Sequence, residues 1–315
     1  MSIIRKIKII LHRIYFKIIR YLNQRHCYDF PAENNGWKKF GDQPVLGNEI
    51  TGTMFDPFVY MENNLLVMIV SERKTGNLVR LESSDGIKWK NQKTVLERIG
   101  GTWESIVNRA SVVVHDGKWH MWYTGQDGTS SKIGYAISND GIHYSRVQQQ
   151  PVVSSIGGEG VSVMNPHVIW NKTKNVFQMW YAAGEDYEPD ILCYAESEDG
   201  VNWSKRQKVL EKDPSHEWEK AKVGGCHVTI DNSGLYTMYY IGYQNVDVAR
   251  ICFAKSTNGI HWTRPKNNLL ISPSRGAWDS DAVYKPTVVE RNGKLLLWYN
   301  GRSALDEYIG LIYKS

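Results

Sequence analysis

Short alternating runs of apolar and polar residues fill most of the chain, and a tight-turn phrase separates them at regular intervals. The phrase occurs as Ser84-Asp85-Gly86-Ile87-Lys88-Trp89, Asn139-Asp140-Gly141-Ile142-His143-Tyr144, Glu198-Asp199-Gly200-Val201-Asn202-Trp203 and Thr257-Asn258-Gly259-Ile260-His261-Trp262. Its Asp or Asn positions lie 55, 59 and 59 residues apart. Asp-Gly and Asn-Gly between alternating apolar runs are typical of β-hairpins, because a type I′ turn needs positive φ at both central residues. The pattern therefore predicts hairpin tips in a repeated all-β fold.

Each repeat holds further strand-like runs around its turn. Aromatic runs that end in a small residue occur at 121–125, 179–183, 238–242 and 297–301, with a degenerate first copy at Val67-Met68-Ile69-Val70-Ser71. A β-branched run precedes each of these, a third run follows, and a fourth comes after the turn. Four short antiparallel strands in each unit of this length are typical of a propeller blade. Five copies of the unit predict a five-bladed β-propeller.

The two ends of the propeller predict how the ring closes. The fifth copy stops after its third strand, at Tyr313-Lys314-Ser315. Residues 35–47 copy the phrase that follows each turn, with Gly36-Trp37 and then Pro44-Val45-Leu46. We expect this segment to complete the last blade, which removes an exposed sheet edge. The alternative is an N-terminal strand with no role in closure.

Residues 1–26 differ from the propeller that we expect over 27–315. Ile3, Ile7, Ile10, Ile14 and Ile18 follow helical spacing, and seven Lys or Arg residues accompany them without any acid. A basic amphipathic helix of this kind is typical of the surface of an anionic membrane, and no apolar run is long enough to span one. The sequence predicts a peripheral protein at the cytoplasmic face of the membrane. A helix packed on the propeller and a partner-binding helix are the alternatives.

Charge and cysteine content narrow the function classes. The net charge is +5, but without the seven basic residues of 1–26 the chain has 31 basic and 33 acidic residues. Nucleic-acid binding is therefore not indicated. The four cysteines show no metal-binding spacing, and Cys193 and Cys252 occupy the same repeat position as Gly134 and Gly310. We expect small buried thiols, no metal and no cofactor.

The repeated phrases resemble those of a known superfamily. Gly-x-Trp-Asp/Glu, Met-Trp-Tyr-x-Gly and Ile-Gly-Tyr-Ala-x-Ser-x-Asp-Gly-Ile-x-Trp are similar to the five-bladed β-propeller glycosidases, which include arabinanases, xylosidases, invertases, levansucrases and mannoside phosphorylases. The resemblance covers residues 35–315. It implies an active site in the axial funnel, on the innermost strand of each blade. It also implies a catalytic Asp on blade one, a second Asp on blade two and a Glu on blade three or beyond.

The innermost strands align by repeat as triplets. They read Asp56-Pro57-Phe58, Arg109-Ala110-Ser111, Asn165-Pro166-His167, Gly225-Cys226-His227 and Lys285-Pro286-Thr287. Alternation places the first and third residue of each triplet on one face. If that face lines the funnel, it carries Asp56, Arg109, Asn165, His167, His227 and Lys285. Asp56 matches the blade-one Asp of the family, whereas Arg109 and Asn165 depart from its carboxylates.

This departure shapes the expected chemistry. Glycoside hydrolysis normally uses two carboxyl groups, and the aligned positions supply one carboxylate among several cations. Arg73 and Arg302, at the ends of second strands, add two more cations for binding substrate. Arg, Lys and His together suit an oxyanion such as phosphate or a nucleotide-sugar diphosphate. His167 and His227 fit a shared structural hydrogen bond equally well.

Other acids supply candidates for a missing proton donor. Glu104, Glu219 and Asp279 follow a tryptophan in a repeated phrase, which indicates a structural role. Glu159, Glu185, Asp186 and Asp281 fall outside the repeat, and we expect Glu185 to be the second catalytic residue.

The sequence thus favours a carbohydrate-active enzyme that transfers or phosphorolyses a glycosidic bond of a membrane-associated saccharide. Plain glycoside hydrolysis and a non-catalytic glycan-binding propeller are the alternatives.

Overall fold

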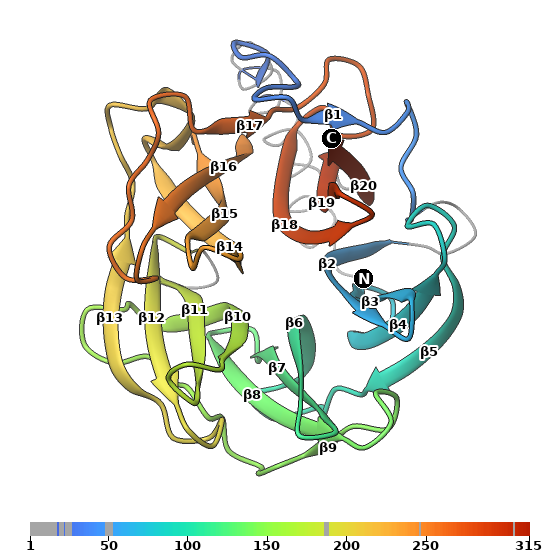
Figure 1. Ribbon diagram of the computed structural model, residues 1–315, viewed down its shortest axis with the longest axis vertical. Helices are drawn as coiled ribbons and strands as arrows, with labels where there is room; N and C mark the ends of the chain where they lie inside the picture. Colours follow the sequence, from blue (N-terminus) through green and yellow to red (C-terminus); the bar gives the residue numbers. More distant parts are fainter. Residues whose placement is uncertain are drawn as a thin grey trace, which may run out of the picture.

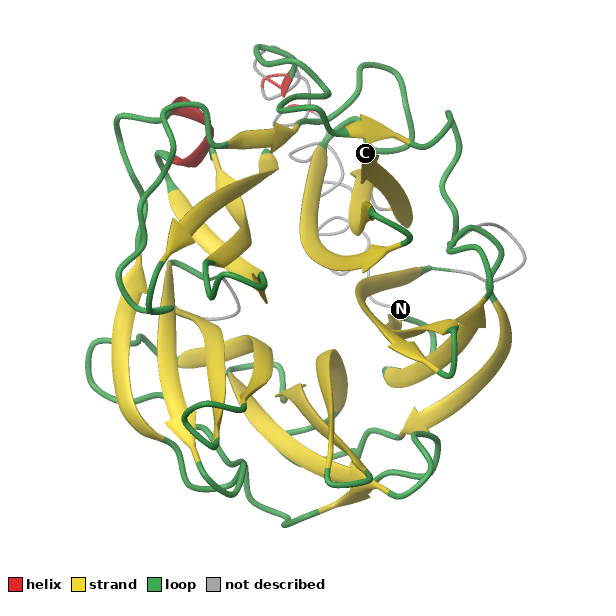
Figure 2. Cartoon of the chain, in the orientation of Figure 1, coloured by secondary structure: helices red, strands yellow, loops and turns green. Residues whose placement is uncertain are grey.

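A computed structural model describes residues 18, 22, 27–47, 53–185, 189–245, 247–304 and 306–315. The described chain forms five four-stranded antiparallel sheets around a central axis, which confirms the predicted propeller (Figure 1). The strands β2, β6, β10, β14 and β18 lie nearest to the axis. Figure 2 shows that strands and turns make up almost all of the propeller.

Blades one to four each take their strands in chain order. Blade one is β2 Met54–Glu62, β3 Leu65–Glu72, β4 Asn77–Ser83 and β5 Lys90–Leu96. Blade two is β6 Ile106–His115, β7 Lys118–Gln126, β8 Ser131–Ser138 and β9 Ser145–Arg146. Blade three is β10 Ser162–Asn171, β11 Val176–Gly184, β12 Ile191–Ser197 and β13 Ser204–Leu210. Blade four is β14 Lys222–Ile230, β15 Tyr236–Tyr243, β16 Ala249–Ser256 and β17 Leu269–Ile271, preceded by the 3₁₀ turn η1 Glu217–Glu219.

Blade five combines both ends of the described chain. It contains β18 Ala282–Arg291, β19 Lys294–Ser303 and β20 Asp306–Lys314, and β1 Lys38–Lys39 pairs with β20 as its outer strand. The backbone N–H of Phe40 donates to Leu311 O (2.8 Å), and Leu46 forms a further bridge with Ile309. This pairing gives the fifth sheet the same four strands as the others.

The repeated turn phrase joins the third and fourth strands of blades one to four, but its conformation differs from the type I′ turn we expected. Only the glycine has positive φ, as at Gly86 (79°), while Asp85 does not. Asp85 instead accepts the backbone N–H groups of Ile87 and Lys88 through one carboxylate oxygen, both at 2.8 Å. Because an Asx turn of this kind needs only one left-handed residue, the loop is longer than a two-residue hairpin.

Tryptophans of the second strands tie these turns to the neighbouring blade. The Nε1 of Trp122 donates to Gly200 O (2.9 Å), that of Trp180 to Gly259 O (2.8 Å) and that of Trp298 to Gly86 O (2.9 Å). The glycine is required there, because a Cβ at Gly86 would lie 2.7 Å from the Trp298 ring. The turn phrase therefore forms part of the contact between blades.

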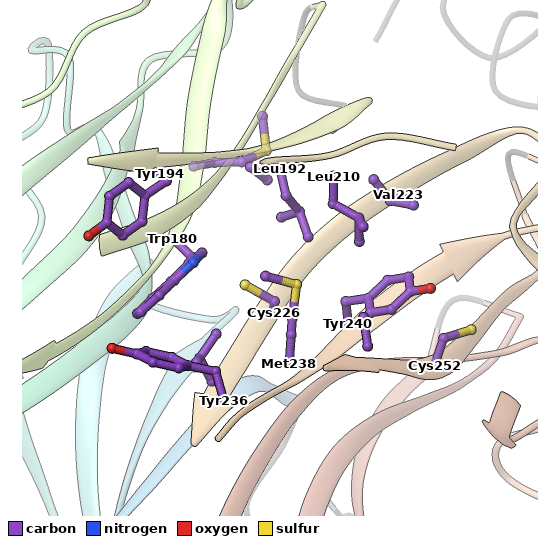
Figure 3. Packing of buried hydrophobic residues seen from close by; sticks show 14 of the residues in the cluster. Trp180, Leu192, Tyr194, Leu210, Val223, Cys226, Tyr236, Met238, Tyr240 and Cys252 are labelled. Atoms are coloured by element: carbon purple, nitrogen blue, oxygen red, sulfur yellow. The ribbon is translucent and has the colours of Figure 1, made fainter. Parts of the chain in front are cut away.

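Hydrophobic residues fill the spaces between adjacent sheets. Figure 3 shows one such cluster, where Trp180 and Leu192 of blade three pack toward Met238 and Tyr240 of blade four. The indoles of Trp122, Trp180 and Trp298 are fully buried. Burial of this aromatic surface is the main force that holds one blade on the next.

The predicted helix over residues 1–26 falls outside the described residues, apart from Ile18 and Leu22. In the described part of the chain, no helix has both the length and the apolar character that crossing a membrane requires.

Candidate functional site

A backbone irregularity recurs near the start of four inner strands. Asp56, Arg109, Asn165 and Lys285 adopt positive φ angles of 55°, 56°, 54° and 52°. The strand register shifts at each of these positions. A bulge of this kind re-aims a side chain, and left-handed angles are costly for residues other than glycine. Four inner strands therefore hold a polar residue in a strained conformation at the same level of the propeller.

Side chains of the preceding blade hold three of these bulges in place. The N–H of Asp56 donates to Asn300 Oδ1 (3.0 Å), the N–H of Arg109 donates to Ser71 Oγ (3.1 Å), and the N–H of Asn165 donates to Thr124 Oγ1 (3.0 Å). Strand pairing makes Ser71 equivalent to Thr124 and Asn300, because they face Phe55, Asn108 and Tyr284. From the sequence, we aligned the run 67–71 with 121–125, which puts Ser71 at the position of Gly125. That alignment was wrong by one residue.

These side chains line a cavity of about 160 Å³ at one end of the axis. Five of the predicted site residues lie together in its wall, namely Asp56, Arg109, Asn165, Lys285 and Arg302, and their roles stay predictions. The remaining lining residues are Pro189, Ile241, Tyr243, Asp247, Ala249, Ala282, Tyr284 and Glu307. Acids and bases are thus balanced, with three of each in the wall. The expectation of a single carboxylate among cations was wrong for the cavity as a whole.

Asp56 is the most enclosed acid of this wall, with 3% of its surface exposed. Its Oδ2 accepts from Arg109 Nε at 3.2 Å, and its Oδ1 accepts from Asn300 Nδ2 at 3.4 Å. Burial raises the pKa of the Asp56 carboxyl above its ordinary value, although Arg109 and Lys285 oppose that shift. Asp56 is therefore suited to hold a proton inside the cavity and to release it to a ligand.

Lys285 is a buried cation with an open position toward the cavity. It is 4% exposed, and among the described residues its ammonium has no hydrogen bond or ion pair. Burial lowers the pKa of Lys285 to about 8, while the charge of Asp56 acts in the opposite direction. A buried ammonium without a partner is costly, so its presence in a cavity wall indicates an anionic or hydroxylated ligand.

Two further polar atoms in the wall are buried without a partner among the described residues. They are Asn165 Oδ1 and Arg302 Nε, while Arg302 Nη2 donates to Asp247 O at 2.6 Å. Buried polar atoms are usually hydrogen-bonded, and unsatisfied ones call for an explanation. An acceptor at Asn165 and a donor at Arg302 are together suited to the hydroxyl groups of a saccharide.

Glu307, at the start of β20, anchors the rim. Tyr284 Oη and Arg73 Nη2 both donate to its carboxylate. Arg73 also stacks on the Phe55 ring at 4.4 Å and lies outside the cavity lining. The structure therefore places Arg73 as the partner of a lining residue, and direct substrate binding by Arg73 stays a prediction.

Blade four leaves its side of the cavity free of polar side chains from the inner strand. A Cβ at Gly225 would lie 2.7 Å from Asn165 Cβ, and one at Gly224 would lie 2.9 Å from the Tyr243 ring. The two glycines therefore allow Asn165 and Tyr243 to occupy their positions. Pro189, Ile241 and Ala249 complete this mainly apolar side of the wall.

His167 and His227 lie outside the cavity lining, although the sequence placed them with it. Their ring centroids lie 4.2 Å apart, and they lie 6.2 and 6.0 Å from the ring centroid of Phe58. His167 Nε2 bonds to Val228 O (2.9 Å), and His227 bonds to the backbone of Val288. Burial lowers the pKa of His167 to about 3 and that of His227 well below its ordinary value. Both rings are neutral links between blades, which agrees with the structural alternative.

Glu185 lies beyond the end of β11, exposed and outside the cavity lining. Its N–H donates to Asp190 Oδ2 at 3.3 Å. Its catalytic role stays a prediction, and Asp186 is not among the described residues. Asp247 and Glu307 are the lining acids that sequence reasoning missed.

The tryptophan-linked acids are structural, as expected. Glu104, Glu219 and Asp279 accept from Tyr123, Tyr240 and Tyr299 at 2.8, 2.8 and 3.0 Å. Glu159 does the same for Tyr181 at 2.6 Å. Its interpretation as an acid outside the repeat was therefore wrong.

No group of three or more His, Cys, Asp or Glu side chains within the described ranges is placed to hold a metal ion. We assign no residue of the cavity to a metal or cofactor.

Comparison with known proteins supports this reading of the fold. Residues 80–224 match the model of the glycosyl hydrolases family 32 N-terminal domain. The uncharacterized protein MT1551 of Mycobacterium tuberculosis (strain CDC 1551 / Oshkosh) is 30% identical over 175 residues, which are 54% of this chain and 56% of that protein. The β-1,2-mannobiose phosphorylase of Thermoanaerobacter sp. (strain X514) is 28% identical over 127 residues, covering 35% and 41% of the two chains. The chain thus spans about half the length of the curated relatives it matches.

Solved structures match over nearly the whole chain. A glycoside hydrolase superposes with a TM-score of 0.69 at 19% identity, covering 90% of this chain and 92% of its own. A structure from the GH130 family of mannoside phosphorylases superposes with a TM-score of 0.66 at 14% identity, covering 90% and 94%. The chain therefore shares its five-bladed fold with these solved structures, and part of it matches the family 32 N-terminal domain.

Proposed function

We propose that this protein is an enzyme that acts on a glycosidic bond in the axial cavity, by phosphorolysis or glycosyl transfer. The observation that carries the proposal is the ion pair of the buried Asp56 with the partly buried Arg109, beside Lys285, an ammonium without a partner among the described residues. This group offers one proton donor and one anion site within the same cavity wall. Phosphorolysis requires both.

Asp56 supplies the proton. Its raised pKa favours the protonated form relative to an ordinary aspartate, and a protonated carboxyl can donate to the glycosidic oxygen. In phosphorolysis, the bond between the anomeric carbon and that oxygen breaks while a phosphate oxygen bonds to the carbon. The leaving sugar takes the proton of Asp56, and the product is a sugar 1-phosphate.

Lys285 and Arg109 supply the positive charge that an attacking phosphate needs. A lysine with a pKa of about 8 is mostly protonated at neutral pH. Charge-assisted hydrogen bonds to phosphate oxygens are among the stronger polar contacts in proteins. In glycosyl transfer from a nucleotide sugar, the diphosphate is the leaving group. The same two cations would then stabilise its negative charge. The likeness to the β-1,2-mannobiose phosphorylase supports phosphate as the first co-substrate to test.

Hydrolysis is the second candidate function. Asp247 and Glu307 line the cavity together with Asp56, so the wall offers more than one carboxylate. Hydrolysis of a glycosidic bond uses two such groups. Glu307 is held by Tyr284 and Arg73, and either Glu307 or Asp247 would have to act as the second acid.

The substrate is a membrane-associated saccharide in this proposal, and the protein is peripheral at the cytoplasmic face. Residues 1–26 carry seven basic residues and no acid, which supports attraction to anionic lipids.

The direct test is to incubate the purified protein with β-1,2-mannobiose and other oligosaccharides, with and without phosphate, and separately with nucleotide sugars. We expect a sugar 1-phosphate that forms only when phosphate is present, or transfer from a nucleotide sugar. A free monosaccharide released equally without phosphate would establish hydrolysis instead. Saccharide binding without turnover in every mixture would contradict an enzymatic role and indicate a glycan-binding propeller.

A further inference from the structure

One position of the second strand lies beside the inner strand of the next blade. Strand pairing places at this position, in blades one to five, Ser71, Thr124, Ala182, Ile241 and Asn300. The hydroxyl oxygens of Ser71 and Thr124 each accept the N–H of a bulged residue in the following blade. A hydroxyl is therefore sufficient to hold such a bulge. Asn300 of β19 differs from the other four residues because it carries an amide.

The amide of Asn300 contacts Asp56 twice. Its Oδ1 accepts the backbone N–H of Asp56 at 3.0 Å, and its Nδ2 donates to Asp56 Oδ1 at 3.4 Å. The backbone N–H needs an acceptor, which fixes the oxygen end of the amide and leaves its NH₂ group toward the carboxyl. Asn300 thus holds both the strained backbone and the side chain of the same residue.

The contact lies in the interior of the protein, beside the cavity. Asn300 is fully buried, and Asp56 is 3% exposed. Asp56 lines the cavity, whereas Asn300 does not. A hydrogen bond in such surroundings is stronger than one in water. Asn300 is therefore placed to act on a reaction in the cavity through Asp56, without contact to the saccharide.

We propose that Asn300 is a positioning residue for Asp56, and that its Nδ2 holds the carboxyl in one orientation through a bond that Ser71 and Thr124 cannot make in their own blades. This inference rests on the proposed role of Asp56 as the proton donor. An amide N–H can donate to a carboxylate and also to the carbonyl oxygen of a protonated carboxyl, so the orientation is kept before and after proton transfer.

The contact at the other carboxyl oxygen explains why a second anchor is needed. Asp56 Oδ2 accepts from Arg109 Nε at 3.2 Å, and the Arg109 side chain is 22% exposed. In the proposed function the charge of Arg109 also binds the attacking phosphate. When the guanidinium turns toward that ligand, Asn300 still holds the carboxyl. Such positioning matters because a misplacement of about 1 Å can cost about 10²-fold in rate.

The loss of the Nδ2 contact has a predictable effect on the charge of Asp56. A hydrogen bond donated to a carboxylate favours its ionised form, so removing the donor should raise the pKa of Asp56. The other groups that act on this carboxyl through their charge are Arg109 of β6, Lys285 and Tyr284 of β18, Glu307 of β20 and Arg73, which follows β3. All of them stay in place when only Asn300 is changed.

The variant Asn300→Thr separates the two contacts of the amide. Blade two has threonine at this position, so the new hydroxyl should still accept the Asp56 N–H, while the donor to the carboxyl is lost. NMR of protein with ¹³C-labelled aspartate carboxyl groups measures the pKa of Asp56, and Asp56→Asn identifies its signal. We expect a folded variant in which this pKa is higher by about 0.5–1 pH unit. An unchanged pKa in folded Asn300→Thr would overturn the inference.

Turnover provides a second readout on the saccharide and co-substrate that give product. At the pH optimum, kcat of Asn300→Thr should fall by about tenfold with KM unchanged, because Asn300 does not line the cavity. The decline of activity at high pH should move upward together with the pKa of Asp56. If Asn300 only held the bulge, Asn300→Thr would match the wild type in kcat and in its pH profile.

A measurement on the wild type keeps the inference testable even where the variant does not fold. The side-chain ¹⁵N signal of Asn300 should shift as Asp56 titrates, because Nδ2 donates to that carboxyl. A signal that stays constant through the Asp56 titration would contradict the contact. Both NMR readouts are independent of turnover, so they can fail while the enzyme is active and succeed where no saccharide is converted.

Discussion

One residue near the start of four inner strands combines left-handed backbone angles with a polar side chain in the cavity wall. Such angles cost about 1–3 kcal/mol for a residue other than glycine. At Asp56, Arg109 and Asn165 the strain persists because the neighbouring blade fixes the backbone through side-chain oxygens. We infer that these positions serve ligand binding, because regular strand geometry would be more stable.

The charge of Lys285 gives a prediction for anion binding. Its pKa of about 8 means that the ammonium loses its proton as the pH rises above that value. Sulfate keeps a constant charge in this range, so we expect its affinity to be steady from pH 6.5 to 7.5. Above about pH 8 the affinity should fall, by up to about tenfold per pH unit.

Isothermal titration calorimetry with sulfate measures this dependence. Lys285→Met keeps Asp56 and Arg109 but removes the titrating ammonium, so it should bind weakly with no decline above pH 8. The same decline in the wild type and the variant would show that another group controls the affinity.

From the sequence we could place the first residue of four inner-strand triplets at the cavity. We could not predict the bulge that turns the third residue of each triplet away from it. Simple alternation put Asn165 and His167 in one funnel, whereas the register shift between Met164 and His167 leaves the histidine in a deeper buried layer. A signal was available in the chain. Pro57, Pro166 and Pro286 follow three of the bulged residues, and proline inside a paired strand is typical of a bulge.

At the scale of the element, a buried trio of tyrosine, acid and cation recurs in four blades. The cation comes from the fourth strand or the loop that follows the turn, as Arg146, Arg206 or Arg264. In blade five it is Lys39 of β1, whose ammonium lies 2.5 Å from Asp279 Oδ2. The closing strand thus supplies the same contact as an ordinary fourth strand.

We predict that Lys39→Ala destabilises the protein far more than Lys38→Ala. Asp279 would remain as a buried charge without its cation, which typically costs about 3–5 kcal/mol. The exposed Lys38→Ala should change the free energy of unfolding by less than about 0.5 kcal/mol. Urea unfolding of both variants measures the difference. Similar values for the two would mean that β1 adds little to closure.

The sequence predicted these elements in number and order, but not all their contacts. The turn phrase was read as a type I′ hairpin because its Asp-Gly pair dominates that signal, whereas the Asp side chain builds a longer turn. Glu159 was placed outside the repeat because no tryptophan precedes it. Its partners Tyr181 and Arg206 are what define its role, and only the fold brings them together.

At the scale of the whole molecule, hydrogen bonds between inner strands link successive blades around the axis. His167 links blade three to blade four, and His227 links blade four to blade five. Thr287 Oγ1 accepts from Val59 N–H at 3.0 Å and links blade five to blade one. Ser111 Oγ accepts from Val168 N–H at 3.0 Å between blades two and three. The third triplet positions therefore stabilise the ring on which the cavity depends.

The neutral histidines predict loss of stability in acid. The pKa of His167 is about 3 in the folded protein and about 6.5 in an unfolded chain, so the unfolded chain binds its proton first as the pH falls. Stability therefore decreases below about pH 6.5, and His167 contributes about 2 kcal/mol of the decrease by pH 5. Urea unfolding measures the decrease in the free energy of unfolding between pH 7 and pH 5. For His167→Gln this decrease should be smaller than for the wild type by that amount. The exposed His261→Gln is the matched control, and an equal reduction there would contradict the assignment.

Ring closure also explains which cavity residues escaped sequence reasoning. Asp247 lies in the loop between β15 and β16, and Glu307 lies at the start of β20. Neither occupies a repeated position, so alignment of inner strands could not select them. The closure of blade five against blade one brings Glu307 near Asp56, whereas Asp247 joins the cavity wall from blade four. The number of blades and the axial position of Asp56 could be predicted, but the balance of charge in the cavity could not.

The most direct measurement compares the turnover of Asp56→Asn with that of the wild type, on the saccharide and co-substrate that give product. Asparagine keeps the size of the side chain but cannot act as a general acid, because its amide does not release a proton near neutral pH. We therefore expect kcat to fall by about 10²–10⁴-fold while the protein stays folded. Asp116→Asn, at an exposed turn at the opposite end of blade two, should keep full activity. An undiminished rate for Asp56→Asn would contradict catalysis in the axial cavity.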